Sequence, residues 1–167
     1  MSTITFKGGP IQTNGDFPEI GQQLSDFKLV TGTLSEVSLQ DFKGKRIVFN
    51  IFPSVDTAVC AMQLKSFSQK MAGIEDLILL SASLDLPFAL NRFCGAEGIE
   101  NAVTTSDFRH HCLKNYGVIM TDGPLAGLSA RAVLILDEHH KIIYSELVNE
   151  VTDEPNYSAA LKVLGIN

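Results

Sequence analysis

The stretch IVFNIFPSVDTAVC at residues 47–60 decides the fold, because a buried strand and a helix meet within it. Residues 47–52 are an apolar run without polar alternation, which predicts a central strand buried on both faces. Residues 61–71 have the periodicity of a helix, so the chain delivers Cys60 to a helix N-terminus. The unpaired N–H groups and the positive dipole end there favour an anion, which predicts that Cys60 is a nucleophilic thiolate.

Strands and helices alternate on both sides of this stretch. Residues 77–81 form a second apolar strand, and two buried strands joined by a helix predict a parallel βαβ unit. Before residue 47, the sequence predicts a hairpin at residues 4–13 and strands at 27–30 and 36–39. After residue 81, it predicts a helix that starts at 85–87 and stops at Gly95 and Gly98, a strand at 102–105 and a short helix at 108–116. The last elements are a hairpin of 132–136 and 141–144 and a helix at 156–164. This order predicts an α/β, thioredoxin-like fold, with a central mixed β-sheet flanked by helices. Residues 1–167 are expected to form a single domain, in which residues 1–16 are an N-terminal hairpin extension.

Composition and charge limit which binding partners and which cellular compartment are expected. The net charge is −6, and the 13 Lys and Arg residues are not clustered, which argues against nucleic-acid and membrane partners. No apolar run approaches the ~20 residues of a membrane span, and the first residues lack the pattern of a signal peptide, so a cytoplasmic protein is expected. In that reducing compartment the three cysteines are expected to be catalytic, metal-binding or buried rather than structural bridges.

Thr57 and Leu64 share a helix face with Cys60, because they are three and four residues away from it. This spacing predicts the Thr57 hydroxyl one turn above the sulfur, within reach of it and of a bound oxygen. The alternative is that Cys60 is a small buried apolar residue, which is the usual environment of a free cysteine.

The combination of Pro53, Thr57 and Cys60 matches the peroxiredoxin pattern of Pro, three residues, Thr or Ser, two residues, Cys. Further segments resemble the bacterial thiol peroxidase branch, the atypical two-cysteine peroxiredoxins: DTAVC at 56–60, DLPF at 85–88, RFCGAEG at 92–98, DGPL at 122–125 and ARAV at 130–133. The resemblance extends over essentially the whole chain. Ala58 departs from the proline that is usual in this family, a change expected to affect rate or helix opening rather than to abolish activity.

The resemblance implies a role for each site residue. Cys60 is similar to the peroxidatic cysteine, which attacks the peroxide O–O bond and becomes a sulfenic acid. Thr57 would bind sulfur and peroxide, and Pro53 would shield the sulfenic acid from water. Arg131 would hold the thiolate and polarise the peroxide, whereas position alone favours a surface charge at a strand end. Cys94 would be the resolving cysteine that forms a disulfide with Cys60, whereas position alone favours a buried helix cysteine.

The implied activity is that of a thioredoxin-dependent thiol peroxidase, which reduces hydrogen peroxide and organic hydroperoxides in antioxidant defence. The resemblance implies no metal or other cofactor, thioredoxin as reductant, and a homodimer. Because there is no Cys-x-x-Cys motif, the bridge must join two separate helices. If their ends start more than about 7 Å apart between Cα atoms, both must partly unwind, at a cost that Gly95 and Gly98 are expected to reduce. The alternatives are a non-enzymatic peroxide-sensing redox relay, a thioredoxin-like disulfide oxidoreductase, and a purely structural domain.

Weaker signals have simpler interpretations. His110, His111 and Cys112, with His139-His140, suggest a metal site, but adjacent helical residues diverge by about 100°, which favours surface histidines and a half-buried cysteine. The loop at 122–127 is expected to shape the site beside Arg131. The acidic residues between 146 and 154 are expected to form a solvated face. A substrate groove is expected to be lined by Phe88, Leu90 and Phe93.

Overall fold

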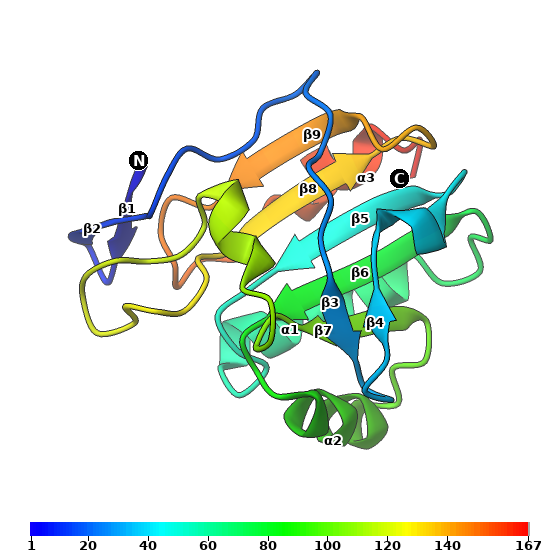
Figure 1. Cartoon of the computed structure of the whole chain (residues 1–167), viewed down its shortest axis with the longest axis horizontal. Coiled ribbons are helices and arrows are strands. Elements are labelled where there is room, and N and C mark those ends of the chain that lie inside the picture. Colours follow the sequence, from blue (N-terminus) through cyan, green and yellow to red (C-terminus); the bar gives the residue numbers. More distant parts are fainter. Residues whose placement is uncertain (167) are drawn as a thin grey trace.

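The computed structural model describes residues 1–166 and is built around a seven-stranded sheet with strand order β4-β3-β7-β6-β5-β8-β9 (Figure 1). The strands are β3 (Leu29–Thr31), β4 (Glu36–Val37), β5 (Arg46–Ile51), β6 (Leu77–Ser83), β7 (Ala102–Ser106), β8 (Ala132–Leu136) and β9 (Ile142–Leu147). β5, β6 and β7 are parallel, whereas β8 is antiparallel to both β5 and β9. The sheet is therefore mixed, and the predicted thioredoxin-like α/β fold is confirmed.

β5 lies in the middle of this sheet and is buried on both faces, as its apolar sequence predicts. Every residue from Ile47 to Ile51 is fully buried. Val48 points into one hydrophobic core, and Phe49 points into the other. The alternation of side chains along the strand thus feeds two separate cores.

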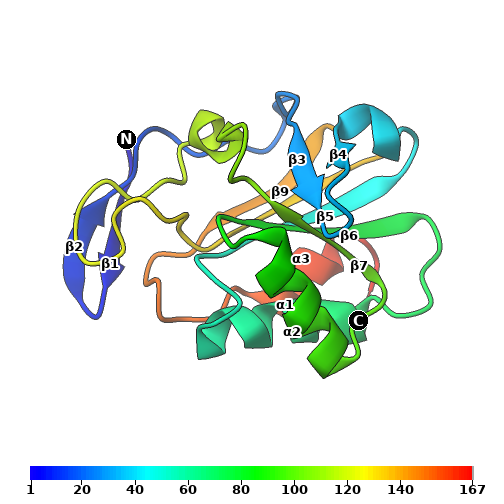
Figure 2. The ribbon, with the colours of Figure 1, turned by 60° about the horizontal axis from the view of Figure 1, so that its bottom comes forward.

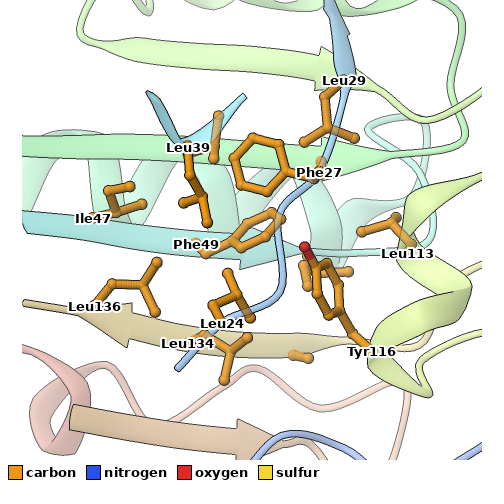
Figure 3. Close-up of a cluster of buried hydrophobic side chains, with 14 of the residues drawn as sticks. Leu24, Phe27, Leu29, Leu39, Ile47, Phe49, Leu113, Tyr116, Leu134 and Leu136 are labelled. Carbon is orange, nitrogen blue, oxygen red and sulfur yellow. The ribbon is translucent and has the colours of Figure 1, made fainter. Parts of the chain in front are cut away.

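The two faces of the sheet are covered differently. The helices α1 (Ala58–Lys70), α2 (Pro87–Glu97) and α3 (Tyr157–Lys162) share one face, where Leu64, Leu90 and Leu161 belong to the same core (Figure 2). The other face is covered by the 3₁₀ helices η1 (Leu39–Phe42) and η2 (Cys112–Tyr116) and by the segment 17–27. Figure 3 shows this second core, in which the Phe27 and Phe49 rings lie 5.5 Å apart.

The N-terminal hairpin forms a sheet of its own from β1 (Thr3–Phe6) and β2 (Gly9–Gln12). It docks on the segment after β9: the Thr5 N–H donates to the Asn149 carbonyl at 2.7 Å, and the Val151 N–H donates to the Thr5 carbonyl at 2.9 Å. The predicted hairpin extension is therefore present, and it adds a strand-like contact to residues 149–151.

Two local predictions need correction. The expected stop of α2 at Gly98, whose φ of 67° is left-handed, is confirmed, but Gly95 lies inside the helix and does not stop it. Residues 108–111 do not form a helix, and His111 has a φ of 54° before η2 begins. The cause is Asp107, whose carboxylate accepts the Cys112 and Leu113 backbone N–H groups and so starts the helical turn later than the pattern suggests.

In the described part of the chain, no helix is both long and apolar enough to cross a membrane.

Candidate active site

Cys60 occupies the first turn of α1, as predicted. The helix begins at Ala58 with Thr57 as its N-cap, so Cys60 is close to the unpaired N–H groups of the helix start. The cysteine is fully buried, and the Ser54 backbone N–H is directed at its sulfur with an N–S distance of 3.5 Å. A backbone hydrogen-bond donor and the N-terminus of a helix thus both lie close to the Cys60 sulfur.

Arg131 lies directly before β8 and is only 2% exposed. Its Nη1 lies 3.2 Å from the Cys60 sulfur and donates to Gln63 Oε1 at 2.8 Å. Its Nε and Nη2 both donate to the Val151 carbonyl, at 3.0 and 2.8 Å. The predicted pairing of Arg131 with Cys60 is therefore present in space, although 71 residues separate the two along the chain.

The charge of this arginine has no conventional counter-ion. Within residues 1–166, no carboxylate lies within ion-pair distance of Arg131. A buried charge without a partner is strongly unfavourable. A thiolate at Cys60 removes this penalty, because the guanidinium already contacts the sulfur.

A buried polar chain behind Arg131 was not predicted from the sequence. Gln63 accepts from Arg131 and donates to Asn50 Oδ1, and Asn50 donates to Ser81 Oγ at 3.2 Å. All three of these neutral residues are at most 1% exposed. Two signals were available: Asn50 is the single polar residue in the run 47–52, and Gln63 lies one turn after Cys60.

Pro53 and Thr57 lie beside the cysteine, but Thr57 differs from its predicted arrangement. Its hydroxyl donates to the Ser54 carbonyl at 3.1 Å rather than to the Cys60 sulfur, and its side chain is exposed. Pro53 is buried. The Thr57 hydroxyl retains lone pairs, and its side chain faces the same pocket as Pro53.

A pocket of about 220 Å³ lies against Arg131 and the start of α1, and the fully buried Cys60 is not itself among the residues that line it. It is lined by Phe6, Pro53, Thr57, Ala58, Val59, Leu125, Arg131, Val151 and Thr152. The lining is mostly apolar, and among the described residues Arg131 is the one charged residue in it. Leu125 belongs to the 122–127 loop, so this loop lies beside Arg131 in the pocket, as expected. The predicted groove residues are elsewhere: Leu90 is buried in the core and Phe88 is exposed outside the pocket.

Cys94 lies on α2, half-buried, with its sulfur 4.0 Å from the Thr104 hydroxyl on β7. Burial raises the pKa of the Cys94 thiol, so it is protonated at neutral pH. Cys60 and Cys94 are both free thiols and contact the same core. Cys60 lies in the first turn of α1, whereas Cys94 lies in the second half of α2 and its sulfur faces Thr104 on β7. A disulfide between them has to join two separate helices and requires their Cα atoms to come within about 7 Å of each other.

Cys112 and two of the histidines contact neighbouring residues away from the Cys60 site. The Cys112 sulfur lies 3.3 and 3.4 Å from the backbone N and O of Lys28. His110 contacts the Glu36 carboxylate, and His140 contacts the Phe42 carbonyl. Among residues 1–166, no group of three or more His, Cys, Asp or Glu side chains is arranged to hold a metal.

Known proteins resemble this chain in sequence and in fold. The family model described as Redoxin matches residues 19–161. A curated thiol peroxidase from Corynebacterium glutamicum is 46% identical over 164 residues, which cover 98% of this chain and 99% of that protein. The crystal structure of a peroxiredoxin-like protein from Aquifex aeolicus has a TM-score of 0.94 and 37% identity, covering 99% of this chain and 96% of that chain. A thiol peroxidase structure from Chromobacterium violaceum has a TM-score of 0.90 and 25% identity, covering 98% of this chain and 95% of that chain. This chain therefore belongs to the redoxin family and, within it, to the thiol peroxidases.

Proposed function

We propose that the protein is a thioredoxin-dependent thiol peroxidase that reduces hydrogen peroxide and organic hydroperoxides. The observation that carries the proposal is the contact between the buried, carboxylate-free Arg131 guanidinium and the Cys60 sulfur, 3.2 Å from Nη1. The contact favours a thiolate, and the adjoining pocket has room for a small molecule.

In the first step, the Cys60 thiolate attacks one peroxide oxygen. An S–O bond forms and the O–O bond breaks, so that Cys60 becomes a sulfenic acid and the second oxygen leaves as an alkoxide or hydroxide, which takes up a proton. Arg131 stabilises the thiolate and the negative charge that develops on the departing oxygen. Pro53 covers the sulfur, and the exposed Thr57 hydroxyl turns to bind the peroxide.

In the second step, Cys94 resolves the sulfenic acid. The Cys94 sulfur loses its proton and attacks the Cys60 sulfur, an S–S bond forms, and the hydroxyl group leaves with that proton as water. The two thiols of thioredoxin then reduce the bridge by thiol–disulfide exchange. Thioredoxin as reductant, a homodimer as the assembled form and a role in antioxidant defence rest on the family resemblance. The cytoplasm as its location rests on the sequence pattern alone.

The decisive experiment is mass analysis of the reduced protein after one equivalent of hydrogen peroxide, followed by turnover with thioredoxin, thioredoxin reductase and NADPH. Wild type is expected to form the Cys60–Cys94 bridge and to consume peroxide repeatedly. Cys60→Ser is expected to lose peroxide consumption, and Cys94→Ser to stop at a sulfenic acid. Cys112→Ser is the matched control and is expected to behave like wild type.

Three results would contradict the proposal. A bridge that includes Cys112 would reassign the resolving cysteine. Oxidation without repeated turnover would favour a redox relay, and insulin reduction without peroxide consumption would favour a disulfide oxidoreductase.

A further inference from the structure

Asp85 connects the segments that carry the two cysteines. It lies after β6 and directly before Leu86, the N-cap of α2. Its carboxylate accepts from the Ser54 hydroxyl at 2.6 Å and from the Val55 backbone N–H at 2.9 Å, both in the turn before α1. It also accepts from the Ser83 hydroxyl at 2.9 Å, at the end of β6. One half-buried side chain therefore ties the start of the Cys60 helix to the start of the Cys94 helix.

Ser54 connects Asp85 to the Cys60 sulfur. Its backbone N–H is directed at Cys60 Sγ at 3.5 Å, and its carbonyl accepts both the backbone N–H and the hydroxyl of Thr57. Its own hydroxyl oxygen accepts the Asp56 N–H at 3.1 Å. The turn before α1 is thus organised around Ser54, and Asp85 fixes the position of Ser54.

The same hydrogen bonds oppose the second step of the proposed reaction. Cys60 is fully buried in the first turn of α1 and is not bonded to Cys94 on α2, so we expect that turn to leave its place for the bridge to form. When that turn moves, Ser54 and Val55 separate from the Asp85 carboxylate. A carboxylate with three neutral donors makes comparatively strong hydrogen bonds, and breaking them contributes to the barrier.

We propose that Asp85 is a positioning residue, which holds the turn before α1 in its peroxide-reactive arrangement and must release it before Cys60 and Cys94 can bond. This inference rests on the proposed function. Asp85 exchanges no proton or electron with the substrate, and it acts only through Ser54 and Val55.

Asp85→Asn tests the proposal, because it keeps the size of the side chain but removes the charge and replaces one acceptor with a donor. Oxidation of Cys60 by hydrogen peroxide is expected to slow about tenfold, since its surroundings lose their order. Disulfide formation from the sulfenic acid is expected to become faster, and the yield of sulfinic acid at excess peroxide to fall. The opposite signs identify a positioning role, because general damage to the structure would slow both steps.

The reduced variants are mixed with hydrogen peroxide, quenched with a thiol-alkylating reagent, and analysed by intact mass for sulfenic acid, disulfide and sulfinic acid. Asp76→Asn is the matched control, because Asp76 makes a surface ion pair with Arg46 at the opposite end of β5. Ser54→Ala removes one of the donors to Asp85, together with the acceptor of the Asp56 N–H, and is expected to reproduce both signs more weakly. It provides a second test if Asp85→Asn fails to fold.

Unchanged rates in well-folded Asp85→Asn and Ser54→Ala, or slowing of both steps, would overturn the role of Asp85. Such results with an active wild type leave the proposed function intact. Failure of wild type to form the Cys60–Cys94 bridge would instead contradict the proposed function itself.

Discussion

At the scale of single residues, the charge that lies closest to the Cys60 sulfur is that of Arg131. All four of its hydrogen bonds go to the Cys60 sulfur, the Gln63 side chain or the Val151 carbonyl. The orientation of the guanidinium therefore depends on neutral acceptors, and its charge remains available to the sulfur. A carboxylate at the position of Gln63 would instead compete with the thiolate for this charge.

Gln63→Leu tests this dependence. The substitution leaves Arg131 Nη1 without its 2.8 Å acceptor and Asn50 without its donor in a fully buried place. We expect the free energy of unfolding to fall by about 2 kcal/mol and the reaction of Cys60 with hydrogen peroxide to slow about tenfold. Urea unfolding and rapid-quench kinetics measure the two effects.

The control for this variant is Gln69→Leu, an exposed position on the same helix. It is expected to change the free energy of unfolding by less than about 0.5 kcal/mol and to leave the rate unchanged. If Gln63→Leu reacts with peroxide at the wild-type rate, the orientation of Arg131 does not depend on Gln63.

At the level of elements, α2 carries a glycine where a helix interior disfavours one. Gly95 follows Cys94 within the helix, and a β-carbon at this position would meet no atom within 4 Å. Glycine is less favourable than alanine in a helix by up to about 1 kcal/mol, because the unfolded backbone is freer. The helix that is expected to open for the disulfide is therefore weakened next to its cysteine.

Gly95→Ala is accordingly expected to stabilise α2 by up to about 1 kcal/mol and to slow disulfide formation by up to about fivefold. The rate is measured from the sulfenic acid to the bridge by rapid quench. Gly98→Ala is the opposite control: its φ of +67° strains a side chain, so it is expected to lower stability and not to slow the bridge. Equal bridging rates in wild type and Gly95→Ala would show that α2 does not open at Gly95.

The N-terminal hairpin is a second element that reaches the site. The Glu150 carboxylate accepts the Gly8 N–H at 2.8 Å and the Thr152 N–H at 2.9 Å, and it also accepts from the Thr5 hydroxyl. The adjacent residue, Val151, provides the carbonyl that holds Arg131. Glu150 therefore does not belong to a merely solvated acidic face, because it fastens the hairpin to the segment behind Arg131.

Low pH is expected to weaken the hydrogen bonds between the Glu150 carboxylate and the N-terminal hairpin. Hydrogen bonds from Thr152 and Gly8 lower the pKa of Glu150 from 4.5 to about 2. The folded state thus binds this proton less tightly than the unfolded chain, and the stability it contributes is present above pH 4.5 and lost as the pH falls toward 2. Hydrogen exchange of residues 3–12 is expected to accelerate across this window in wild type.

In Glu150→Gln, residues 3–12 are expected to exchange faster than in wild type already at neutral pH. Because the carboxylate is gone, lowering the pH from 4.5 to 2 is expected to cause no further loss of protection through position 150. Glu100→Gln, at another exposed carboxylate, is expected to follow wild type. Hairpin protection that is identical in Glu150→Gln and wild type at neutral pH would show that the carboxylate does not hold the hairpin.

Local patterns predicted the elements better than their contacts. The strand at 47–52, the first turn around Cys60 and the N-terminal hairpin follow from apolar runs and turn residues, which act over a few positions. The end of α2 at Gly98 also followed from its glycine, but Gly95 does not interrupt the helix. The start of η2 was wrong, because the Asp107 side chain decides it. Glu150, Asp85 and Gln63 were missed as partners because each acts across the fold on residues that no local pattern connects.

At the scale of the whole molecule, the sheet separates a face with the proposed chemistry from a face without it. α1 and α2 carry Cys60 and Cys94 on one face, where Figure 2 shows both helices beside α3. The opposite core, with Phe27, Phe49 and Tyr116, carries none of the proposed site residues (Figure 3). Because the strands between the two cysteines are fully paired and buried, the sheet is expected to stay rigid while the helices move.

This division predicts the pattern of amide hydrogen exchange in the reduced and disulfide forms. The segments around residues 53–63 and 87–98 are expected to lose protection in the disulfide form, since the bridge has to join two separate helices and both helix regions are expected to rearrange. Strands β5, β6 and β8 are expected to keep the same protection in both forms, because their ladder is unchanged. Cys94→Ser treated with peroxide is the control, since it is oxidised without a bridge and should keep the reduced pattern in α2. Equal protection of both helices in the two forms would mean that the sulfurs meet without unwinding, and loss of protection across β5 and β6 would mean that the sheet itself opens.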